Sequence, residues 1–351
     1  MNTPRLPEQD LDSVLGHVDH LWSDLRGQAL FFTGGSGFVG SWLLESLLHA
    51  DKALALGVRA TVLTRSIARM AAKLPHLAND PRVEMIEGDV RHWAGEGRHR
   101  DFRYLIHGAA DASAALNREA PLVMIDTIVA GTRRALEYAR DSGIKRVLML
   151  SSGGVYGNVP LSIPNVPEDY AGAPDPLDSY YAYAEAKRMA ELLCAVYAKQ
   201  YGMEIPVARL FAFVGPRLPL DAHFAAGNFI RDAMQGGEIV IEGDGTAVRS
   251  YLYAADLAAW LWTVLLRGES GRAYNVGSDE AVSIRQLADI TAGVFPGGKS
   301  VTVSGRINAS NPISRYVPDI GRARADLGLG VWTPLREALS RTVDWLTVKA
   351  S

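Results

Sequence analysis

Short hydrophobic runs alternate with amphipathic stretches over the first half of the chain. Five runs are predominantly apolar, which is typical of strands buried on both faces of a parallel sheet. They cover residues 29–32, 60–63, 83–86, 104–106 and 147–150. Two stretches between them, residues 38–50 and 121–142, repeat their apolar positions at helical spacing. This alternation of strand and helix predicts an α/β fold with a doubly wound parallel sheet of the Rossmann type.

The two ends of the chain follow other patterns. Apolar residues recur at helical spacing over residues 11–26, so residues 1–27 are expected to form an N-terminal helical extension. Residues 28–208 then make up the first α/β domain. Beyond it, glycine and proline cluster in loop-like segments, which indicates a smaller, less regular domain over residues 209–351. Strand-like residues at both ends of 249–276 predict that this segment rejoins the first sheet.

Composition and charge narrow the class of protein. The 36 basic and 39 acidic residues give a net charge of −3 without a long basic run, so a nucleic-acid partner is not expected. Cys194 is the single cysteine, which rules out an internal disulfide and fits a reducing compartment. No apolar run is long enough for a membrane span, and the N-terminus lacks a signal-peptide pattern. We therefore expect a cytoplasmic protein without membrane contact, and the lack of metal-ligand spacing predicts no metal.

A glycine-rich turn joins the first strand to the first helix of the sheet. Its pattern is Gly34-x-x-Gly37-x-x-Gly40, and Phe38 and Val39 open the helix. Glycines at this spacing let backbone amides approach a pyrophosphate, which then lies at the positive end of the helix dipole. Glycine turns alone are common, but the position between a strand and an amphipathic helix makes this one specific. These five residues are predicted to bind NAD or NADP, and the first domain becomes the dinucleotide-binding domain.

The end of the second strand bears on the choice of dinucleotide. NAD-binding domains of this type carry an acid there that bonds the adenosine ribose, whereas this strand ends in Thr64-Arg65. Arg65 could pair with a 2′-phosphate in two-pronged geometry, which favours NADP. Alternatively, Arg65 is simply exposed and NAD is held by other contacts, and the sequence leaves both open. Asp89 and Val90 follow the third strand and are placed to contact the adenine.

A Tyr-x-x-x-Lys pair lies on a helix predicted over residues 180–201. Tyr183 and Lys187 are four residues apart and therefore project from one face of the helix. The ammonium, together with a positive nicotinamide, would lower the tyrosine pKa from its reference value near ~10. The phenolate could then accept the proton of a carbinol while the hydride leaves for the cofactor. Tyr180 and Tyr181 have no lysine four residues later, so Tyr183 is the candidate.

A serine pair ends the strand that precedes this helix. Doubly wound sheets present their ligands at the carboxyl ends of the strands, so Ser152 could hydrogen-bond to a substrate oxygen and polarise it. Ser151 is the close alternative, and both hydroxyls could instead bond the backbone of the local turn. The glycine loop, a serine at a strand end and the Tyr-Lys pair, found in this order, make a chance arrangement improbable.

These motifs resemble those of a known family. Over most of its length the chain is similar to the nucleotide-sugar epimerase/dehydratase branch of the extended short-chain dehydrogenases/reductases. The similarity is carried by the glycine loop, by Ser151-Ser152-x-x-Val155-Tyr156-Gly157 and by Tyr183-x-x-x-Lys187-x-x-x-Glu191. The resemblance implies that Ser152, Tyr183 and Lys187 form the catalytic triad, with Lys187 also holding the nicotinamide ribose. It further implies a nucleotide-diphosphate sugar as substrate and a homodimer built from helices 121–142 and 180–201.

The second half of the chain resembles the substrate side of the same family. Asn228 opens a helix, where its amide and free N–H groups could meet a diphosphate. Arg249 follows a Gly-Asp-Gly loop similar to the loop whose arginine clamps that diphosphate, and two-pronged bonding suits a guanidinium to this role. Tyr316 lies in a segment that resembles the last substrate-binding segment, with Arg306 or Arg315 as a second clamp. For Arg306 a surface position is the better interpretation. The smaller domain is therefore expected to bind the substrate.

The sequence departs from the family pattern next to the catalytic hydroxyl. Family dehydratases carry an Asp-Glu pair there, and decarboxylases a glutamate, but Gly153 and Gly154 occupy these places and cannot transfer protons. Ala212 and Ile128 stand where asparagine is usual, so the substrate pose is expected to be unusual. The glycines argue against 4,6-dehydration and decarboxylation, which leaves hydride transfer at the sugar C4.

Two enzymes and one non-enzyme fit this pattern best. An NDP-hexose 4-epimerase, the preferred interpretation, oxidises the C4 hydroxyl and returns the hydride to the other face of the sugar. An NADPH-dependent NDP-4-keto-sugar reductase, which Arg65 favours, transfers hydride once; an NDP-sugar 4,6-dehydratase is less favoured. A non-catalytic NAD(P)-binding sensor is the alternative of another class, but such proteins typically lose the tyrosine or the lysine, and both are present here.

Overall fold

A parallel sheet forms the centre of the first half of the chain. The computed structural model describes residues 3–93, 95, 101–110, 114–222, 224–306 and 314–350. Within them, seven parallel strands pair in the order β11-β6-β5-β4-β1-β2-β3. The strands are β1 (Ala29–Thr33), β2 (Arg59–Thr64), β3 (Val83–Glu87), β4 (Phe102–His107), β5 (Arg146–Ser152), β6 (Val207–Leu210) and β11 (Ala273–Val276). The predicted doubly wound sheet of the Rossmann type is confirmed.

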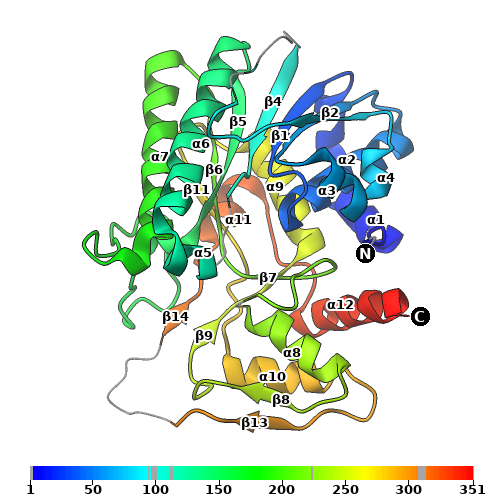
Figure 1. The fold of residues 1–351 in the computed structure, drawn as a ribbon, viewed down its shortest axis with the longest axis vertical. Coiled ribbons are helices and arrows are strands. Elements are labelled where there is room, and N and C mark those ends of the chain that lie inside the picture. Colours follow the sequence, from blue (N-terminus) through cyan, green and yellow to red (C-terminus); the bar gives the residue numbers. More distant parts are fainter. Residues whose placement is uncertain are drawn as a thin grey trace.

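Helices cover both faces of this sheet (Figure 1). Alternate residues of a strand face opposite sides, so Leu30 and Phe32 join the core beneath α2 and α9, while Phe31 joins the core beneath α6 and α7. These helices are α2 (Phe38–Leu54), α6 (Pro121–Asp141), α7 (Ala182–Tyr201) and α9 (Ala254–Arg267), and the shorter ones around the sheet are α3 (Ile67–Lys73), α4 (Pro75–Ala78), α5 (Ala114–Glu119) and α11 (Gly321–Leu327). In the part of the chain that the structure describes, none of the helices combines the length and apolarity needed to cross a bilayer.

The strand order changes direction beside β1. From there β2 and β3 extend to one side and β4, β5, β6 and β11 to the other. In open α/β sheets the ligand binds at such a reversal, outside the carboxyl ends of the strands. The glycine loop leaves the carboxyl end of β1, and the serine pair forms the carboxyl end of β5. Parallel pairing therefore brings both motifs to one edge of the sheet.

The N-terminal extension is a helix followed by a 3-10 helix, not the single helix predicted over residues 11–26. The first, α1 (Glu8–His17), ends before Val18, whose backbone leaves the helical region at φ −125° and ψ 30°. The second, η1 (Asp19–Leu25), follows directly. The break lets Trp22 donate its indole N–H to a carbonyl oxygen of α1 at 3.1 Å while its ring stays buried. Because α1 packs against α2 and α9, the extension is part of the main body.

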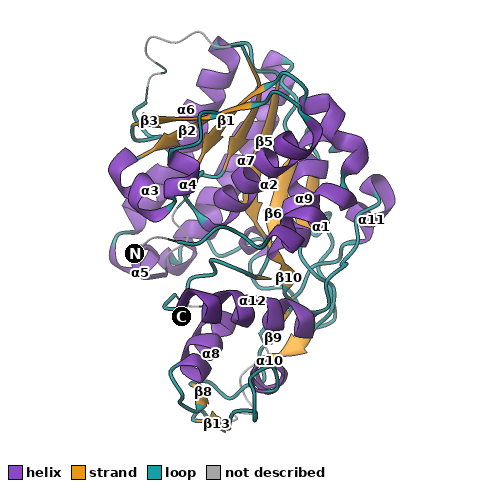
Figure 2. Ribbon diagram, turned by 90° about the vertical axis from the view of Figure 1, so that its right-hand side faces the viewer, coloured by secondary structure: helices purple, strands orange, loops and turns teal. Residues whose placement is uncertain are grey.

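The rest of the chain forms a second lobe, below the sheet in Figures 1 and 2. Its short strands pair as β10-β7, β12-β9-β14 and β13-β8. They are β7 (Phe213–Val214), β8 (Ile239–Ile241), β9 (Val248–Arg249), β10 (Leu252–Tyr253), β12 (Val282–Ser283), β13 (Val301–Val303) and β14 (Arg315–Tyr316), with helices α8 (Ala225–Met234), α10 (Ile284–Ala292) and α12 (Leu335–Ala350). Of segment 249–276, the end at β11 joins the main sheet as predicted, whereas its beginning belongs to the small sheets.

Candidate active site

The glycine loop leaves β1 and folds back on its own backbone before α2 begins. Gly34 has φ +79°, and a Cβ built on it would lie 2.5 Å from a backbone carbonyl oxygen of the loop after β4. A Cβ on Gly40 would lie 2.4 Å from the carbonyl oxygen of Gly34, so neither position accepts a side chain. Gly37 is the N-cap of α2, whose first N–H groups lack partners within the helix. This cradle fits a pyrophosphate held by backbone amides, the role predicted for these glycines with Phe38 and Val39.

The residues predicted to meet the adenosine end follow β2 and β3. Arg65 comes directly after β2 and is exposed. Asp89 comes after β3 and is paired with Arg91, with 2.6 Å between Oδ2 and Nη2. This hydrogen-bonded pair lowers the pKa of Asp89. Val90 is buried in the core beneath α6. The contacts of these three residues with an adenosine stay a prediction.

Ser152, Tyr183 and Lys187 meet where β5 packs against α7. Ser152 is the last residue of β5, and the other two stand on the first turns of α7. Lys187 is 4% exposed; its ammonium donates to the carbonyl oxygen of Leu150 at 2.8 Å and lies 5.9 Å from the centre of the Tyr183 ring. A Cβ built on Gly154 would lie 3.3 Å from Ser152 Oγ and 3.9 Å from Cε1 of Tyr183, so the serine hydroxyl and the tyrosine ring border the same space. The structure thus assembles the three predicted catalytic residues at the carboxyl edge of the sheet.

The two serines at the end of β5 have different partners. Ser151 donates a hydrogen bond to Glu191 Oε1 at 2.5 Å, and Glu191 is paired with Arg209 at 2.7 Å. Ser152 accepts a hydrogen bond from the N–H of Gly154 at 3.1 Å and lies on the same side as the Tyr183 ring. Neighbouring residues of a strand point to opposite faces. Of the two serines that the sequence left open, Ser152 lies on the side of Tyr183, whereas Ser151 faces Glu191, and the catalytic role of Ser152 stays a prediction.

A charged network behind the serines was missed by the sequence analysis. Arg209 donates three hydrogen bonds to Glu191, at 3.0, 3.3 and 2.7 Å, and one to the hydroxyl oxygen of Tyr156 at 2.9 Å. Tyr156 in turn donates to Asn275 Oδ1 at 2.6 Å. The four side chains come from β6, α7, β11 and the 3-10 helix η2 (Gly153–Tyr156). Glu191 was visible as part of the helix motif, but no local spacing linked it to the strands that hold its partners.

Asn117 on α5 fastens the start of α7 and was also missed. Its Oδ1 accepts a hydrogen bond from the backbone N–H of Tyr183 at 3.0 Å, and its Nδ2 donates to the carbonyl oxygen of Tyr180 at 2.8 Å. The first N–H groups of a helix have no partner within the helix, so this contact satisfies one of them and fixes where the helix begins. No motif or periodicity in the sequence marks this asparagine.

Burial is the largest influence on the pKa values of the two candidate catalytic groups. It raises the pKa of Tyr183, and the nearby Ser152 hydroxyl opposes the rise in part. It also lowers the pKa of Lys187 to about 8, although the nearby Glu191 carboxylate favours the charged form. The lowering of the Tyr183 pKa predicted from the sequence therefore does not follow from the helix spacing. It requires additional positive charge beside the phenol, which an oxidised nicotinamide carries when bound.

An aromatic pair fills the space beside Gly153. A Cβ built on this glycine would lie 2.6 Å from the hydroxyl oxygen of Tyr316 and 2.6 Å from the tip of the Phe211 ring. The two rings pack together with 4.5 Å between their centroids. A Cβ on Gly154 would be less crowded, at 3.3 Å from Ser152 Oγ. An acidic side chain at position 153 would displace both rings, so this glycine is required by the packing of the site.

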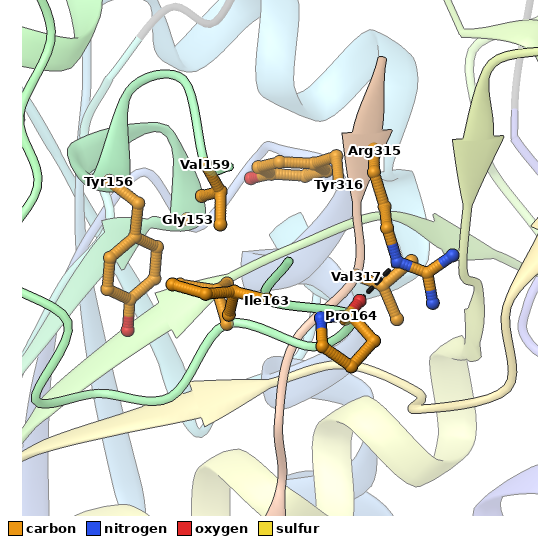
Figure 3. A pocket seen from close by; sticks show the side chains of 9 residues that line it. Gly153, Tyr156, Val159, Ile163, Pro164, Arg315, Tyr316 and Val317 are labelled. Carbon is orange, nitrogen blue, oxygen red and sulfur yellow. Dashed lines mark hydrogen bonds between the residues drawn. The ribbon is translucent and has the colours of Figure 1, made fainter. Parts of the chain in front are cut away.

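A small pocket lies between Gly153 and β14 (Figure 3). Its lining is mostly apolar, and Arg315 and Tyr316 contribute polar groups at the β14 side. The Arg315 guanidinium donates to the carbonyl oxygen of Pro164 and to Asn165 Oδ1, the second at 3.2 Å. Arg315 therefore holds the neighbouring loop against β14. These contacts weigh against the second diphosphate clamp that the sequence offered.

The other predicted substrate residues come from separate elements of the second lobe. Parallel pairing of β9 with β14 places Arg249 opposite Tyr316. Arg249 is partly buried and donates to two backbone carbonyl oxygens, at 2.8 and 3.1 Å. Asn228 lies in the first turn of α8. The sequence analysis expected a free backbone N–H here, but that N–H donates to the carbonyl oxygen of Phe224 at 3.1 Å. Arg306 is exposed, in line with the surface position preferred for it.

The two replaced asparagines have local explanations. Ile128 is 1% exposed and belongs to the apolar core between α6 and the sheet, where an unpaired amide would be costly. Ala212 lies between β6 and β7, and its carbonyl oxygen accepts the N–H of Leu252 at 3.0 Å, which links β10 to the main body. Ile128 therefore contributes to packing, and Ala212 contributes its backbone.

Comparisons with known proteins agree with this geometry. The model of the NAD dependent epimerase/dehydratase family matches residues 30–277. UDP-glucuronic acid decarboxylase 1 of Xenopus tropicalis is 30% identical over 323 residues, which cover 92% of this chain and 73% of that protein. UDP-glucuronic acid decarboxylase 5 of Arabidopsis thaliana is 31% identical over 88% of this chain and 86% of that protein.

Solved structures share the fold over nearly the whole chain. The dTDP-glucose 4,6-dehydratase of Streptomyces venezuelae, crystallised with NAD, has a TM-score of 0.76 at 25% identity and covers 92% of this chain and 97% of its own. The UDP-glucose 4-epimerase of Thermotoga maritima, crystallised with UDP-glucose, has a TM-score of 0.76 at 23% identity and covers 92% of this chain and 100% of its own. The likeness therefore extends to both lobes.

Proposed function

Because the chain belongs to the NAD-dependent epimerase/dehydratase family, we propose that it transfers hydride at C4 of a nucleotide-diphosphate sugar. The family inferred from the motifs is confirmed, and with it an enzyme that uses NAD or NADP. The cradle around Gly34 and Gly40 would hold the pyrophosphate, and Lys187 would hold the nicotinamide ribose. When bound, the nicotinamide supplies the hydride acceptor and donor.

One observation supports this proposal: Ser152 and Tyr183 lie together beside the buried Lys187, with no acidic side chain at positions 153 and 154. In the oxidation, Ser152 hydrogen-bonds to the C4 oxygen and the Tyr183 phenolate accepts its proton. The C4–H bond breaks, and both of its electrons leave with the hydrogen as hydride. In the return step Tyr183 gives the proton back to the same oxygen.

We favour the 4-epimerase among these reactions. Dehydration needs a base that removes the C5 proton and an acid that protonates the leaving C6 hydroxyl. Gly153 and Gly154 offer neither, and the space beside Gly153 is taken by Phe211 and Tyr316. Epimerisation needs no group besides the triad, because the keto sugar only has to turn over before the hydride returns. The NADPH-dependent 4-keto-sugar reductase remains the alternative that exposed Arg65 favours.

The names of the relatives support decarboxylation as a second candidate. Oxidation at C4 of a hexuronic acid places a ketone β to the C6 carboxylate. The C5–C6 bond can then break with loss of carbon dioxide, its electrons passing into the enolate, and no base has to remove a C5 proton. The two glycines therefore weigh against dehydration more strongly than against decarboxylation. The argument against decarboxylation drawn from the sequence was too strict for this reason.

Products separate these reactions. One sample of the purified protein is denatured and any released nucleotide is identified. A second, native sample is incubated with UDP-glucose, UDP-galactose, UDP-glucuronic acid or a UDP-4-keto-hexose and with each cofactor, and the products are read by NMR. Retained NAD and a product differing at C4 alone support the epimerase. A pentose product supports the decarboxylase, and NADPH consumption with a 4-keto sugar supports the reductase. Retained cofactor without turnover of any sugar would favour the binding sensor and contradict the proposal.

Tyr183→Phe tests the role of the phenol directly. We expect kcat to fall at least ~10³-fold, because the proton acceptor is lost. Cofactor affinity should be retained, since the ring still packs beside Lys187. Tyr201→Phe, at the far end of the same helix, is the control and should keep full activity. Unchanged turnover in Tyr183→Phe would contradict the mechanism.

We also propose that α6 and α7 form a homodimer interface. The two helices pack side by side, and α7 exposes the apolar residues Met189, Leu192 and Val196 at helical spacing. Leu192→Glu should dissociate the dimer in light scattering, whereas Leu177→Glu, in an exposed loop, should not. A monomeric wild-type protein would contradict this interface. A cytoplasmic location stays a prediction.

A further inference from the structure

Two segments that are far apart in the chain line the same pocket (Figure 3). Residues 164–168 lie in the loop after η2, and residues 315–319 begin with β14. The N–H of Val166 donates to the carbonyl oxygen of Val317, and the N–H of Asp319 donates to the carbonyl oxygen of Val166, each at 2.9 Å. These two ranges, the pocket segments, are therefore joined through their backbones.

Asn275 of β11 is bonded to both pocket segments at once. Its side chain is fully buried. Its Nδ2 donates to the carbonyl oxygen of Val166 at 2.9 Å and to that of Asp319 at 3.0 Å, while its Oδ1 accepts the Tyr156 hydroxyl at 2.6 Å. Its backbone N–H donates to Glu168 Oε1 at 2.8 Å. One residue of the central sheet thus fastens the two segments to the sheet and to each other.

The network fixes which end of this amide faces the pocket segments. Arg209 donates to the Tyr156 hydroxyl at 2.9 Å, and a guanidinium cannot accept a hydrogen bond in return. The single phenol proton of Tyr156 therefore goes to Oδ1 of Asn275. Both N–H donors of the amide then face the two backbone carbonyl oxygens, which can only accept. The position requires a side chain with two donors and one acceptor, which an amide supplies.

The strand pairing of β14 is short, which gives this anchor its importance. β14 is two residues long and pairs with β9, which is also two residues long. Pairs of strands this small are marginally stable unless they pack on a larger structure. β11, by contrast, pairs with β6 inside the seven-stranded sheet. Asn275 connects the segment that carries Tyr316 to the sheet whose carboxyl edge forms the cofactor side.

We propose that Asn275 is a positioning residue for the nucleotide sugar: its amide clamps the two pocket segments together and sets the position of Tyr316 relative to the cofactor side. The role rests on the proposed function and on the prediction from the sequence that Tyr316 binds the sugar. The side-chain bonds of Asn275 go to the pocket segments and to Tyr156, not to the glycine cradle. Loss of the amide should therefore weaken sugar binding and leave cofactor binding unchanged.

Asn275→Asp tests the clamp, because it keeps the shape of the side chain and leaves at most one proton for two carbonyl oxygens. We expect the backbone amides of Val166 and Asp319 to exchange with deuterium about 10-fold faster, read by mass spectrometry of peptides that cover the pocket segments. Peptides from β1 and β5 should exchange as in the wild type. Asn79→Asp, the same change at an exposed position after α4, is the control and should alter neither.

Two outcomes of this exchange experiment overturn the proposal. Unchanged exchange in the pocket segments would show that the amide does not hold them. Equally faster exchange in the pocket segments and in β1 and β5 would show that Asn275 only stabilises the fold. Should Asn275→Asp fail to fold, the wild-type protein gives a second measurement by NMR. Both carboxamide protons of Asn275 should then exchange far more slowly than those of Asn79, and equal rates overturn the clamp.

Kinetics test whether the clamp serves the sugar. In Asn275→Asp we expect KM for the nucleotide sugar found by the product screen to rise about 10-fold with little change in kcat. The affinity for NAD, measured by calorimetry, should be unchanged. A fall in kcat at constant KM, or an equal weakening of NAD binding, overturns the positioning role. The exchange experiment needs no sugar, so a screen that finds no substrate defeats the proposed function while the exchange rates still decide the clamp.

Discussion

The cofactor side and the substrate side of the candidate site are built in different ways. On the cofactor side, Gly34 and Gly40 belong to one turn, and Tyr183 and Lys187 to one helix face. On the substrate side, two-residue strands from distant parts of the chain pair to place Arg249 beside Tyr316. A turn or a helix converts sequence spacing into distance in space, whereas paired short strands take their positions from packing between the lobes. The effects of a substitution should therefore stay near the substituted residue on the cofactor side. On the substrate side they should extend to residues from other segments of the site.

Gly34→Ala and Gly236→Ala form a matched pair for the cofactor side. Their φ angles are +79° and +78°, so an alanine costs about 1–2 kcal/mol of backbone strain at either position. At Gly34 the new Cβ would also meet a backbone carbonyl oxygen at 2.5 Å, whereas nothing lies within 4 Å at Gly236. We expect Gly34→Ala to weaken NAD binding roughly 100-fold and Gly236→Ala to leave it unchanged, measured by calorimetry. Equal affinities would show that the loop does not hold the cofactor.

Arg249→Met tests the substrate side. Loss of charge-assisted hydrogen bonds to a diphosphate should raise KM about 30-fold, measured with the nucleotide sugar that the product screen identifies. Arg285→Met, which breaks an exposed ion pair with Asp289 on α10, should leave KM unchanged. A simultaneous fall in kcat would show that Arg249 also holds Tyr316 in place and would sharpen the contrast between the two sides. An unchanged KM would remove Arg249 from the binding site.

Gly153→Ala and Gly154→Ala test how far a local change spreads. A methyl group at 153 meets Tyr316 and Phe211 at 2.6 Å, while one at 154 meets Ser152 Oγ at 3.3 Å. Overpacking of the first kind costs about 1–3 kcal/mol, so we expect Gly153→Ala to lower kcat about 10-fold and the melting temperature as well. Gly154→Ala should have the smaller effect in both assays. Equal effects would mean that the aromatic pair does not fill the space beside Gly153.

The smallest and most local effect is expected at His107, on the cofactor side, where burial should make the stability of the protein depend on pH. Burial lowers its pKa from 6.5 to about 3, and its ring nitrogens are bonded to Thr33 at 2.8 Å and Thr132 at 3.0 Å. Between pH 6.5 and about pH 3, His107 binds a proton in the unfolded chain but not in the folded protein. The free energy of unfolding therefore falls as the pH falls, by up to about 1.4 kcal/mol per pH unit.

Urea unfolding at pH 7 and pH 5 measures this contribution. His107→Gln should lose less stability than the wild type over that interval, whereas His20→Gln, at an exposed position, should follow the wild type. Parallel losses in all three proteins would show that His107 does not titrate as its burial implies.

The sequence by itself determined most of the cofactor side. Apolar runs separated by amphipathic stretches specified the parallel sheet, because strands buried on both faces have no polar side. The glycine spacing specified the cradle, since backbone approaches of this kind leave no room for a Cβ at Gly34 or Gly40. A separation of four residues on a helix specified the Tyr183–Lys187 pair.

Only the tertiary structure decided the rest. It separated Ser152 from Ser151, paired Glu191 with Arg209, and placed Tyr316 in the space beside Gly153. Each of these outcomes depends on side chains from segments far apart in the chain, which meet because the core packs in one way. Periodicity records which face of an element is buried, but it carries no information about the partner that buries it.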